Sequence, residues 1–189
     1  AVSLGVWPFV VMSNFAFAQG SFRTDLVGEH EVPPIFSESY GSALVVGNND
    51  SLKYQINVTS LDKVTGAFLY KGDSTENGKL LVSLLNSTEP SGLIDGNLIE
   101  GTINSSSILV PLANLTTNIA LPVSVGNLTN ATAASVGNLT NATAPIMPPS
   151  KLESLIELMS QNMTYINILT SDFPQGELRG SLASTNSTG

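Results

Sequence analysis

Residues 52–58 read LKYQINV, a strict alternation of apolar and polar side chains. Successive side chains of a β-strand point to opposite faces, so this stretch predicts a strand with Leu52, Tyr54, Ile56 and Val58 facing the core. Similar short runs at 42–46, 64–70, 80–85, 98–103, 165–169 and 177–182 are separated by turn signals. This pattern is typical of an all-β, antiparallel fold, and we expect a β-sandwich or barrel.

One or two short helices are expected before the last two of these strands. Ser150 and Glu153 have the spacing of a capping box, in which each side chain bonds to the backbone amide of the other residue. The apolar residues that follow lie at helical spacing: Leu152, Leu155, Ile156 and Met159. A weaker helix is predicted over 107–115. The loop 71–78 ends in Asn77-Gly78, a dipeptide favoured in β-hairpins.

The composition excludes several classes of chemistry. A chain of 189 residues predicts one domain, and its net charge of -8 argues against nucleic-acid binding. The absence of cysteine excludes thiolate nucleophiles, cysteine-ligated zinc and disulfides. One histidine, His30, leaves almost no material for a catalytic triad or an imidazole metal site. We therefore expect no cofactor and no catalytic residue.

The N-terminal segment indicates export. Residues 1–22 carry no charged side chain, and an apolar run ends in Ala16-Phe17-Ala18, a small-x-small pattern that a signal peptidase could cleave. We expect a signal peptide over 1–18, with a retained N-terminal anchor as the alternative. Contact with a membrane is expected only if that segment is retained. The β domain is predicted to span 20–183, and 184–189 are expected to form a disordered tail.

Asparagine glycosylation signals are more frequent than chance. Eleven Asn-x-Ser/Thr sequences occur where composition predicts about 4. Four of them lie in a tandem repeat, SVGNLTNATA, within a low-complexity insertion at 122–149. The candidates are Asn49, Asn57, Asn86, Asn104, Asn114, Asn127, Asn130, Asn138, Asn141, Asn162 and Asn186. We expect a glycosylated chain located outside the cell or on its surface.

Three segments in a fixed order resemble the CHRD domain, the module named after chordin. They are LVGEHEVPP at 26–34, VTGAFLYKG at 64–72, and YINILT at 165–170 followed by FPQGELRG at 173–180. The resemblance implies an immunoglobulin-like β fold and an extracellular location. The residues that carry the family signature are Glu31, Val32, Pro33, Pro34, Gly66, Ala67, Gly72, Pro174, Gly176, Glu177, Arg179 and Gly180.

The sequence departs from the family at three histidine positions, which are occupied by Phe68, Tyr70 and Leu169. A metal site implied by the family therefore cannot be transferred to this chain. Phe68 and Tyr70 alternate on one strand, so we expect them to share a face and pack as an aromatic pair. The segment GAFLYKGD is also similar to the copper-binding strand of Cu/Zn superoxide dismutase, but it lacks the same histidines.

The remaining candidate residues favour structural roles. Asp73 and Glu76 lie in one loop and could form a weak calcium site, although a solvated acidic turn is the simpler interpretation. Glu177 and Arg179 are two residues apart and should share one face of the last strand, which we expect them to hold in place. His30, between two glutamates, is expected to be a solvated loop residue.

The sequence thus favours a secreted or cell-surface, glycosylated binding or scaffold module without catalytic activity. Its partner would be an extracellular protein or glycan, contacted through exposed loops at 29–40 and 71–78 and through the insertion. A structural subunit of a cell-envelope or extracellular assembly, formed by self-association, is the main alternative. An enzyme that acts on glycans through paired carboxylates is a more remote one.

Overall fold

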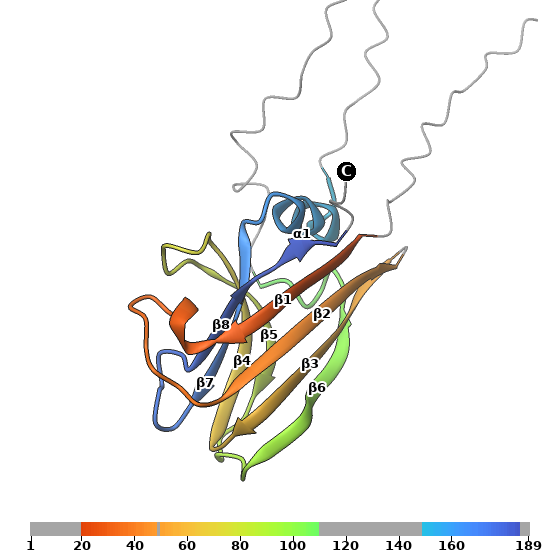
Figure 1. Cartoon of the computed structure of the whole chain (residues 1–189). Helices are drawn as coiled ribbons and strands as arrows, with labels where there is room; N and C mark the ends of the chain where they lie inside the picture. The colour runs from red at the N-terminus through yellow and green to blue at the C-terminus, as the bar shows by residue number, and fades with distance from the viewer. Residues whose placement is uncertain (1–19, 49, 110–148, 186–189) are drawn as a thin grey trace, which may run out of the picture.

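The computed structural model describes residues 20–48, 50–109 and 149–185, which form one antiparallel β-sheet and one α-helix (Figure 1). The strands lie in the order β5-β4-β7-β8-β1-β2-β3-β6, and β9 pairs with β1. Their bounds are β1 Ser21–Val27, β2 Tyr40–Asn48, β3 Ser51–Leu61, β4 Val64–Lys71, β5 Leu80–Asn86, β6 Ile94–Ile103, β7 Thr164–Thr170, β8 Leu178–Ser181 and β9 Ala183–Ser184. The predicted all-β, antiparallel class is confirmed.

The sheet bends into two halves of four strands that face each other. Strands β1, β2, β3 and β6 form one half, and β4, β5, β7 and β8 form the other (Figure 1). Within the described residues one register pair, Val27 with Arg179, joins β1 to β8. Strands β5 and β6 are the two edges, so the architecture is a sandwich that is nearly closed into a barrel.

The core fills the space between the halves. Leu52, Ile56 and Val58 are almost fully buried there, as their alternation predicts. Tyr54 packs against the same core, and its hydroxyl donates a hydrogen bond of 3.2 Å to the carbonyl oxygen of Leu84 on β5. Tyr54 belongs to β3, which is paired with the edge strand β6, whereas Leu84 belongs to the other edge strand, β5. This bond therefore links the two halves across the seam, the line along which β5 and β6 face each other without pairing.

The helix α1, Lys151–Ser160, closes one end of the barrel (Figure 1). Both bonds of the predicted capping box between Ser150 and Glu153 are present. Leu152, Leu155 and Met159 are buried in the core, whereas Ile156 is half-buried. In the described part of the chain, no helix has both the length and the apolar character needed to cross a bilayer.

One local prediction agrees with the structure and another differs from it. Strands β4 and β5 form a hairpin whose loop, 72–79, nearly coincides with the predicted 71–78, and Asn77-Gly78 lies near the end of that loop. The side chain of Asn77 bonds to two other segments. The predicted helix at 107–115 is absent over 107–109, which are turn and extended chain, and the rest of it lies outside the described residues.

The C-terminal end of the domain extends beyond the predicted one. Ser184 pairs with Phe22 in β1, and the Thr185 N–H donates to the Ser21 oxygen at 2.8 Å. The sheet therefore includes Ser184, and Thr185 is bonded to it, although both were assigned to the tail. The signal segment 1–18 and the insertion 122–149 lie outside the described residues, apart from position 149.

Candidate functional site

The outward side of β4, β7 and β8 collects the polar and aromatic residues of the motifs. In β7 the core-facing Ile166 and Ile168 alternate with outward Tyr165, Asn167 and Leu169. Register pairs then place Tyr70 opposite Tyr165, and both Phe68 and Arg179 opposite Asn167. We call this surface the covered face and define it by these residues: Phe68, Tyr70, Tyr165, Asn167, Leu169 and Arg179. The three family histidine positions all lie on it.

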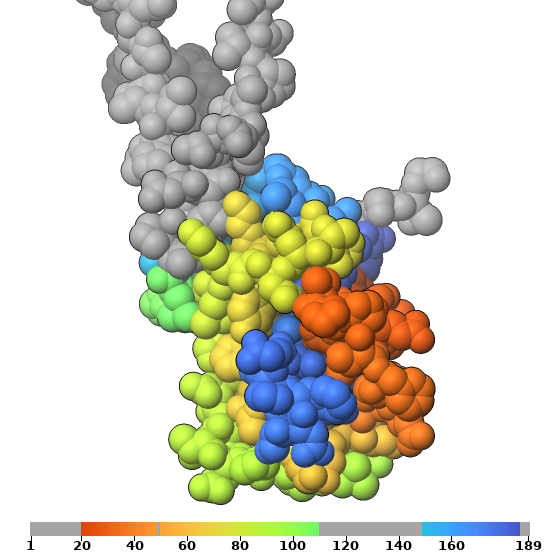
Figure 2. All heavy atoms as spheres, turned by 90° about the vertical axis from the view of Figure 1, so that its left-hand side faces the viewer, coloured from red at the N-terminus to blue at the C-terminus, as the bar shows by residue number. Residues whose placement is uncertain are grey.

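Three loops pack over the covered face, and Figure 2 shows them side by side. They are 28–39, which begins with the 3-10 turn Gly28–His30, then 72–79 between β4 and β5, and 171–177 between β7 and β8. The Asn77 amide donates 2.9 Å to the Val32 carbonyl oxygen, and the Ser37 hydroxyl donates 2.9 Å to Glu177 Oε1. These two bonds link the first loop to the other two.

The aromatic residues of the covered face form a continuous stack. Phe68 meets Tyr70 edge to face with ring centroids 6.3 Å apart, as the predicted aromatic pair requires. Tyr70 stacks on Tyr165 at 5.3 Å and 11°. The guanidinium carbon of Arg179 lies 3.6 Å from the centroid of the Tyr165 ring, within the range of a cation–π contact. Aromatic packing therefore occupies positions 68 and 70, two of the three at which the resemblance implies imidazoles.

Arg179 is completely buried and ties the 72–79 loop to the sheet. Its Nη1 donates 2.8 Å to Asn77 Oδ1, and its Nη2 donates to the carbonyl oxygens of Asp73 and Glu76 at 2.8 and 2.7 Å. The backbone oxygens that a calcium ion would need in this loop are thus occupied by a guanidinium. The Asp73 carboxylate accepts two bonds from Thr75, which lower its pKa.

Glu31 is the second buried ionisable residue of the site, with 5% of its surface exposed. Its Oε2 accepts a bond of 3.3 Å from Asn167 Nδ2. Burial raises the pKa of Glu31 from 4.5 to about 7, although the charge of Arg179 and the bonds from Val32 and Asn167 act in the opposite direction. Burial, assisted by the neighbouring Tyr165 and Glu31, also raises the pKa of the Tyr70 hydroxyl.

Glu177 and Arg179 do not pair with each other. Glu177 Oε1 accepts the bond from Ser37, and Oε2 accepts one of 2.6 Å from the buried Thr170 hydroxyl. The prediction that both lie on the last strand is wrong for Glu177, which lies in the loop before β8, Leu178–Ser181, and each of the two residues holds a different loop. Among the described residues, no group of three or more histidine, aspartate and glutamate side chains is placed to hold a metal ion.

The other candidates are spread over the surface. His30 is exposed, as predicted. Of the glycosylation candidates, Asn86, Asn104 and Asn162 are exposed and Asn57 is half-buried in β3. The remaining ones lie outside the described residues: Asn49, Asn114, Asn127, Asn130, Asn138, Asn141 and Asn186.

Sequence reasoning did not assign roles to Tyr165, Asn167 and Glu31. A signal for the first two was present, because alternation in β7 places them on the same face as Leu169. Glu31 belongs to the EVPP signature, but nothing in the sequence shows that it contacts residue 167.

The fold and the site together define a class of protein, an antiparallel β-barrel domain in which loops cover one face of the sheet. A buried arginine on the sheet and a buried glutamate in a loop make the hydrogen bonds that hold two of these loops against that face. A family model for the CHRD domain matches residues 22–182, so the chain belongs to the CHRD family. Comparison with curated proteins and with solved structures gave no match. Membership of this family indicates a binding module of the extracellular type.

Proposed function

We propose that this chain is a secreted or cell-surface, glycosylated module that binds an extracellular protein through the 28–39 loop and has no catalytic activity. The residues that would make the contact lie at the side of the barrel shown in Figure 2, where the three loops meet. This proposal retains the loop-mediated binding expected from the sequence and assigns it to one of the loops.

The observation that carries the proposal is the exposure of Phe36. Its side chain is 83% exposed, although the chain on both sides of it is fixed. The Ile35 N–H donates 3.1 Å to the Gly28 oxygen, and the Ser37 hydroxyl is bound to Glu177. An aromatic side chain presented on a fixed loop loses little conformational entropy when a partner covers it, which is a property of binding hot spots.

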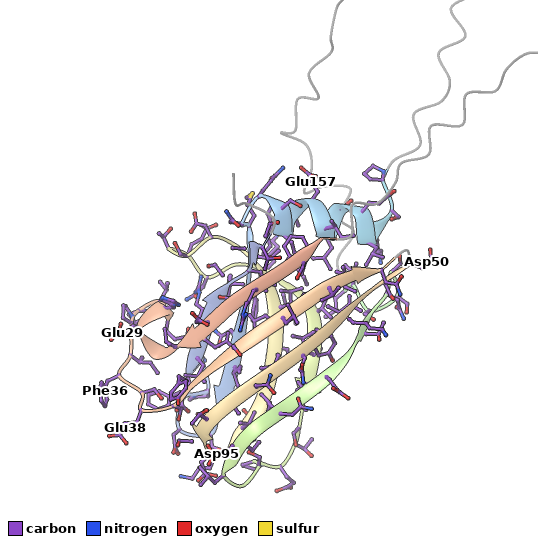
Figure 3. The ribbon with its side chains drawn as sticks, turned by 45° about the vertical axis from the view of Figure 1, so that its right-hand side comes forward. Glu29, Phe36, Glu38, Asp50, Asp95 and Glu157 are labelled. Atoms are coloured by element: carbon purple, nitrogen blue, oxygen red, sulfur yellow. The ribbon has the colours of Figure 1, made fainter. Side chains whose placement is uncertain are left out.

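The surroundings of Phe36 indicate the chemistry of the partner. Glu29 and Glu38 are exposed on the same projecting loop (Figure 3). Pro33 and Pro34 are exposed as well and extend its apolar surface. The partner that fits is a protein with an apolar pocket for the phenyl ring and lysine or arginine side chains around it.

Burial of the carboxylates supports a non-catalytic role. Glu31 and Glu177 are 5% and 8% exposed and lie beneath the loops. Carboxylates that cleave a glycosidic bond must flank that bond directly. Both oxygens of Glu177 are already engaged by hydroxyl groups of the protein itself.

Self-association through the sheet edges, the basis of the structural-subunit alternative, has less support. The edge strands β5 and β6 flank one seam, which the bond from Tyr54 to Leu84 bridges. The pairing of β6 with β3 also contains irregularities between Ile56 and Asn57 and between Val58 and Leu61. Such irregularities make an edge a poor template for another strand.

The test measures binding of the purified, fluorescently labelled chain to cells of the source organism. Phe36→Ala should raise the apparent Kd by about 10- to 100-fold, because burying a phenylalanine side chain contributes about 1.5–3 kcal/mol to the free energy of binding. Leu109→Ala is the matched control, since Leu109 is 57% exposed and lies beside α1. Protease treatment of the cells should abolish binding of the wild type.

Equal binding of Phe36→Ala and the wild type would refute the proposal. Binding that survives protease but is lost after glycosidase treatment would identify a glycan as the partner instead. Size-exclusion chromatography of the same material tests the assembly alternative, for which a polymer rather than a monomer is expected. Mass spectrometry of native protein should find sugar on Asn86, Asn104 or Asn162 and a mature start near residue 19, and absence of both would contradict export.

A further inference from the structure

Three buried polar atoms without a hydrogen-bond partner lie in one cluster beneath the 28–39 loop. They are Glu31 Oε1, Asn167 Oδ1 and Arg179 Nε; a fourth in the described residues, Thr164 Oγ1, belongs to the start of β7. A buried polar atom without a partner costs free energy, so a group of them requires an explanation.

The orientation of the Asn167 amide is fixed by its donors. Nδ2 donates to Glu31 Oε2 at 3.3 Å and to the Gln175 carbonyl oxygen at 3.2 Å. A reversed amide would place its oxygen against two acceptors, so Oδ1 must be the atom without a partner. A Cβ placed on Gly176 would lie 2.4 Å from Asn167 Oδ1 and 2.5 Å from Glu31 Oε1. The two unpartnered oxygens therefore converge on one point.

Two converging acceptors need a donor between them, and a carboxylic acid supplies one. We propose that Glu31 and Asn167 form a proton-binding site, in which un-ionised Glu31 donates its Oε1–H to Asn167 Oδ1, and that loss of this proton to solvent releases the 28–39 loop. With the proton in place, both oxygens are satisfied by a single hydrogen bond. Without it, Glu31 Oε1 and Asn167 Oδ1 are both acceptors and cannot bond to each other.

The alternatives fit less well. The Cβ position of Gly176 is one covalent bond length from the Gly176 Cα, so a water molecule centred at that point would overlap the glycine backbone. A cation would be placed near the buried guanidinium of Arg179, whose charge repels it.

Burial and the charge of Arg179 act on the pKa of Glu31 in opposite directions. The Arg179 guanidinium attracts the ionised form, but it donates its bonds to the 72–79 loop and none to Glu31. Burial outweighs that attraction and raises the pKa of Glu31 to about 7. The titratable or charged groups on the elements packed around this cluster are Tyr70, Tyr165 and Arg179 on the covered face, Asp73, Glu76 and Glu177 on the adjoining loops, and the exposed Glu29 and His30 just before Glu31.

Ionisation of Glu31 would act directly on the segment that carries Phe36. Glu31 is five residues before Phe36 in the same loop, and the Glu31 N–H donates 3.1 Å to the Gly28 oxygen. To reach water, an ionised Glu31 must leave Asn167 and pull Val32 away from Asn77. The effect of the proton on partner binding rests on the proposed function, whereas the proton site does not.

The first experiment follows the Glu31 carboxyl carbon by NMR in the full chain labelled with 13C-glutamate, from pH 4 to pH 9. The resonance is assigned by its absence from Glu31→Gln. A titration midpoint near pH 7 is expected. A midpoint near 4.5, where an ordinary glutamate titrates, would overturn the proposal. This measurement needs only the wild type if the variant fails to fold, because the resonance is then assigned by its proximity to the Asn167 amide.

The second experiment measures amide hydrogen exchange of Ile35 and Ser39, corrected for the intrinsic pH dependence of exchange. In the wild type and in the control Glu29→Gln, protection should fall by up to about tenfold per pH unit between pH 4.5 and 7 and level off above pH 7. In Glu31→Gln it should stay constant, because the glutamine amide can donate to Asn167 Oδ1 at every pH. The same pH profile in wild type and Glu31→Gln would overturn the proposal.

The cell-binding assay at pH 6 and pH 8 separates the two proposals. Weaker binding at pH 8 by the wild type but not by Glu31→Gln supports both. If the Glu31 carbon titrates near pH 7 and the loop opens while binding is unchanged, the proton site stands and the binding role of the loop is wrong.

Discussion

Replacing Glu31 with glutamine should remove a large part of the pH dependence of unfolding between pH 4.5 and 7. In the folded chain burial raises the pKa of Glu31 to about 7, whereas the unfolded chain has the ordinary value of 4.5. The folded state therefore binds this proton more tightly. Its contribution to stability is complete below pH 4.5 and is lost as the pH rises through about 7.

The size of the effect follows from the two pKa values. They are about 2.5 pH units apart, and each unit corresponds to about 1.4 kcal/mol. The free energy of unfolding of the wild type should thus fall by about 3 kcal/mol from this group alone. Because domains of this size are stable by about 5–15 kcal/mol, the change is large enough to measure.

Urea denaturation, monitored by far-UV circular dichroism and repeated at half-unit steps from pH 4 to pH 8, gives the free energy of unfolding at each pH. The quantity of interest is the difference between wild type and Glu31→Gln, in which the titration of all other groups cancels. Glu38→Gln, at an exposed position of the same loop, should follow the wild type. A difference that stays flat from pH 4 to pH 8 would refute the reasoning.

Three further substitutions test other parts of the structure by the same denaturation assay. Arg179→Lys should lower the free energy of unfolding by at least about 2 kcal/mol, because lysine cannot reach three acceptors in a planar arrangement; an unchanged value would contradict the role given to the guanidinium. Tyr54→Phe should cost about 1 kcal/mol by removing the bond to Leu84 across the seam, and no loss would mean that the seam is held by packing alone. Ser150→Ala should lower the free energy of unfolding by about 1 kcal/mol and speed hydrogen exchange in the first turn of α1. Ser160→Ala, in the last turn of α1, should leave hydrogen exchange in the first turn unchanged.

The features that the sequence predicted well depend on neighbours along the chain. Alternation at 52–58 predicted the core face of β3, because a strand alternates its side chains regardless of what it pairs with. The capping box of Ser150 and Glu153 was predicted for the same reason, since both partners lie in one helical turn. Phe68 and Tyr70 were correctly assigned to one face and to packing, because they are separated by a single residue.

The features that it missed depend on contacts between distant segments. Asn77-Gly78 carries a hairpin signal, but Asn77 serves two partners from other parts of the chain, Val32 and Arg179. Glu31 and Asn167 are separated by 136 positions in the sequence, and no local pattern indicates that they touch. The order of the strands decides these contacts, and that order was not predicted.

The covered face shows why the pKa of a glutamate can be raised although a buried arginine lies nearby. A guanidinium close to a carboxyl normally favours the carboxylate. Here the donors of Arg179 are directed to Asn77 and to backbone oxygens of the 72–79 loop, and its face lies against the ring of Tyr165. The guanidinium charge is therefore stabilised by neutral hydrogen-bond acceptors and by an aromatic ring. Glu31 receives no hydrogen bond from it, only the weaker coulombic attraction. If the 72–79 loop moved away, Arg179 would lose these partners and Glu31 would become its best remaining acceptor. The contacts of the 72–79 loop with Arg179 thus bear on the pKa of Glu31, a residue of another loop.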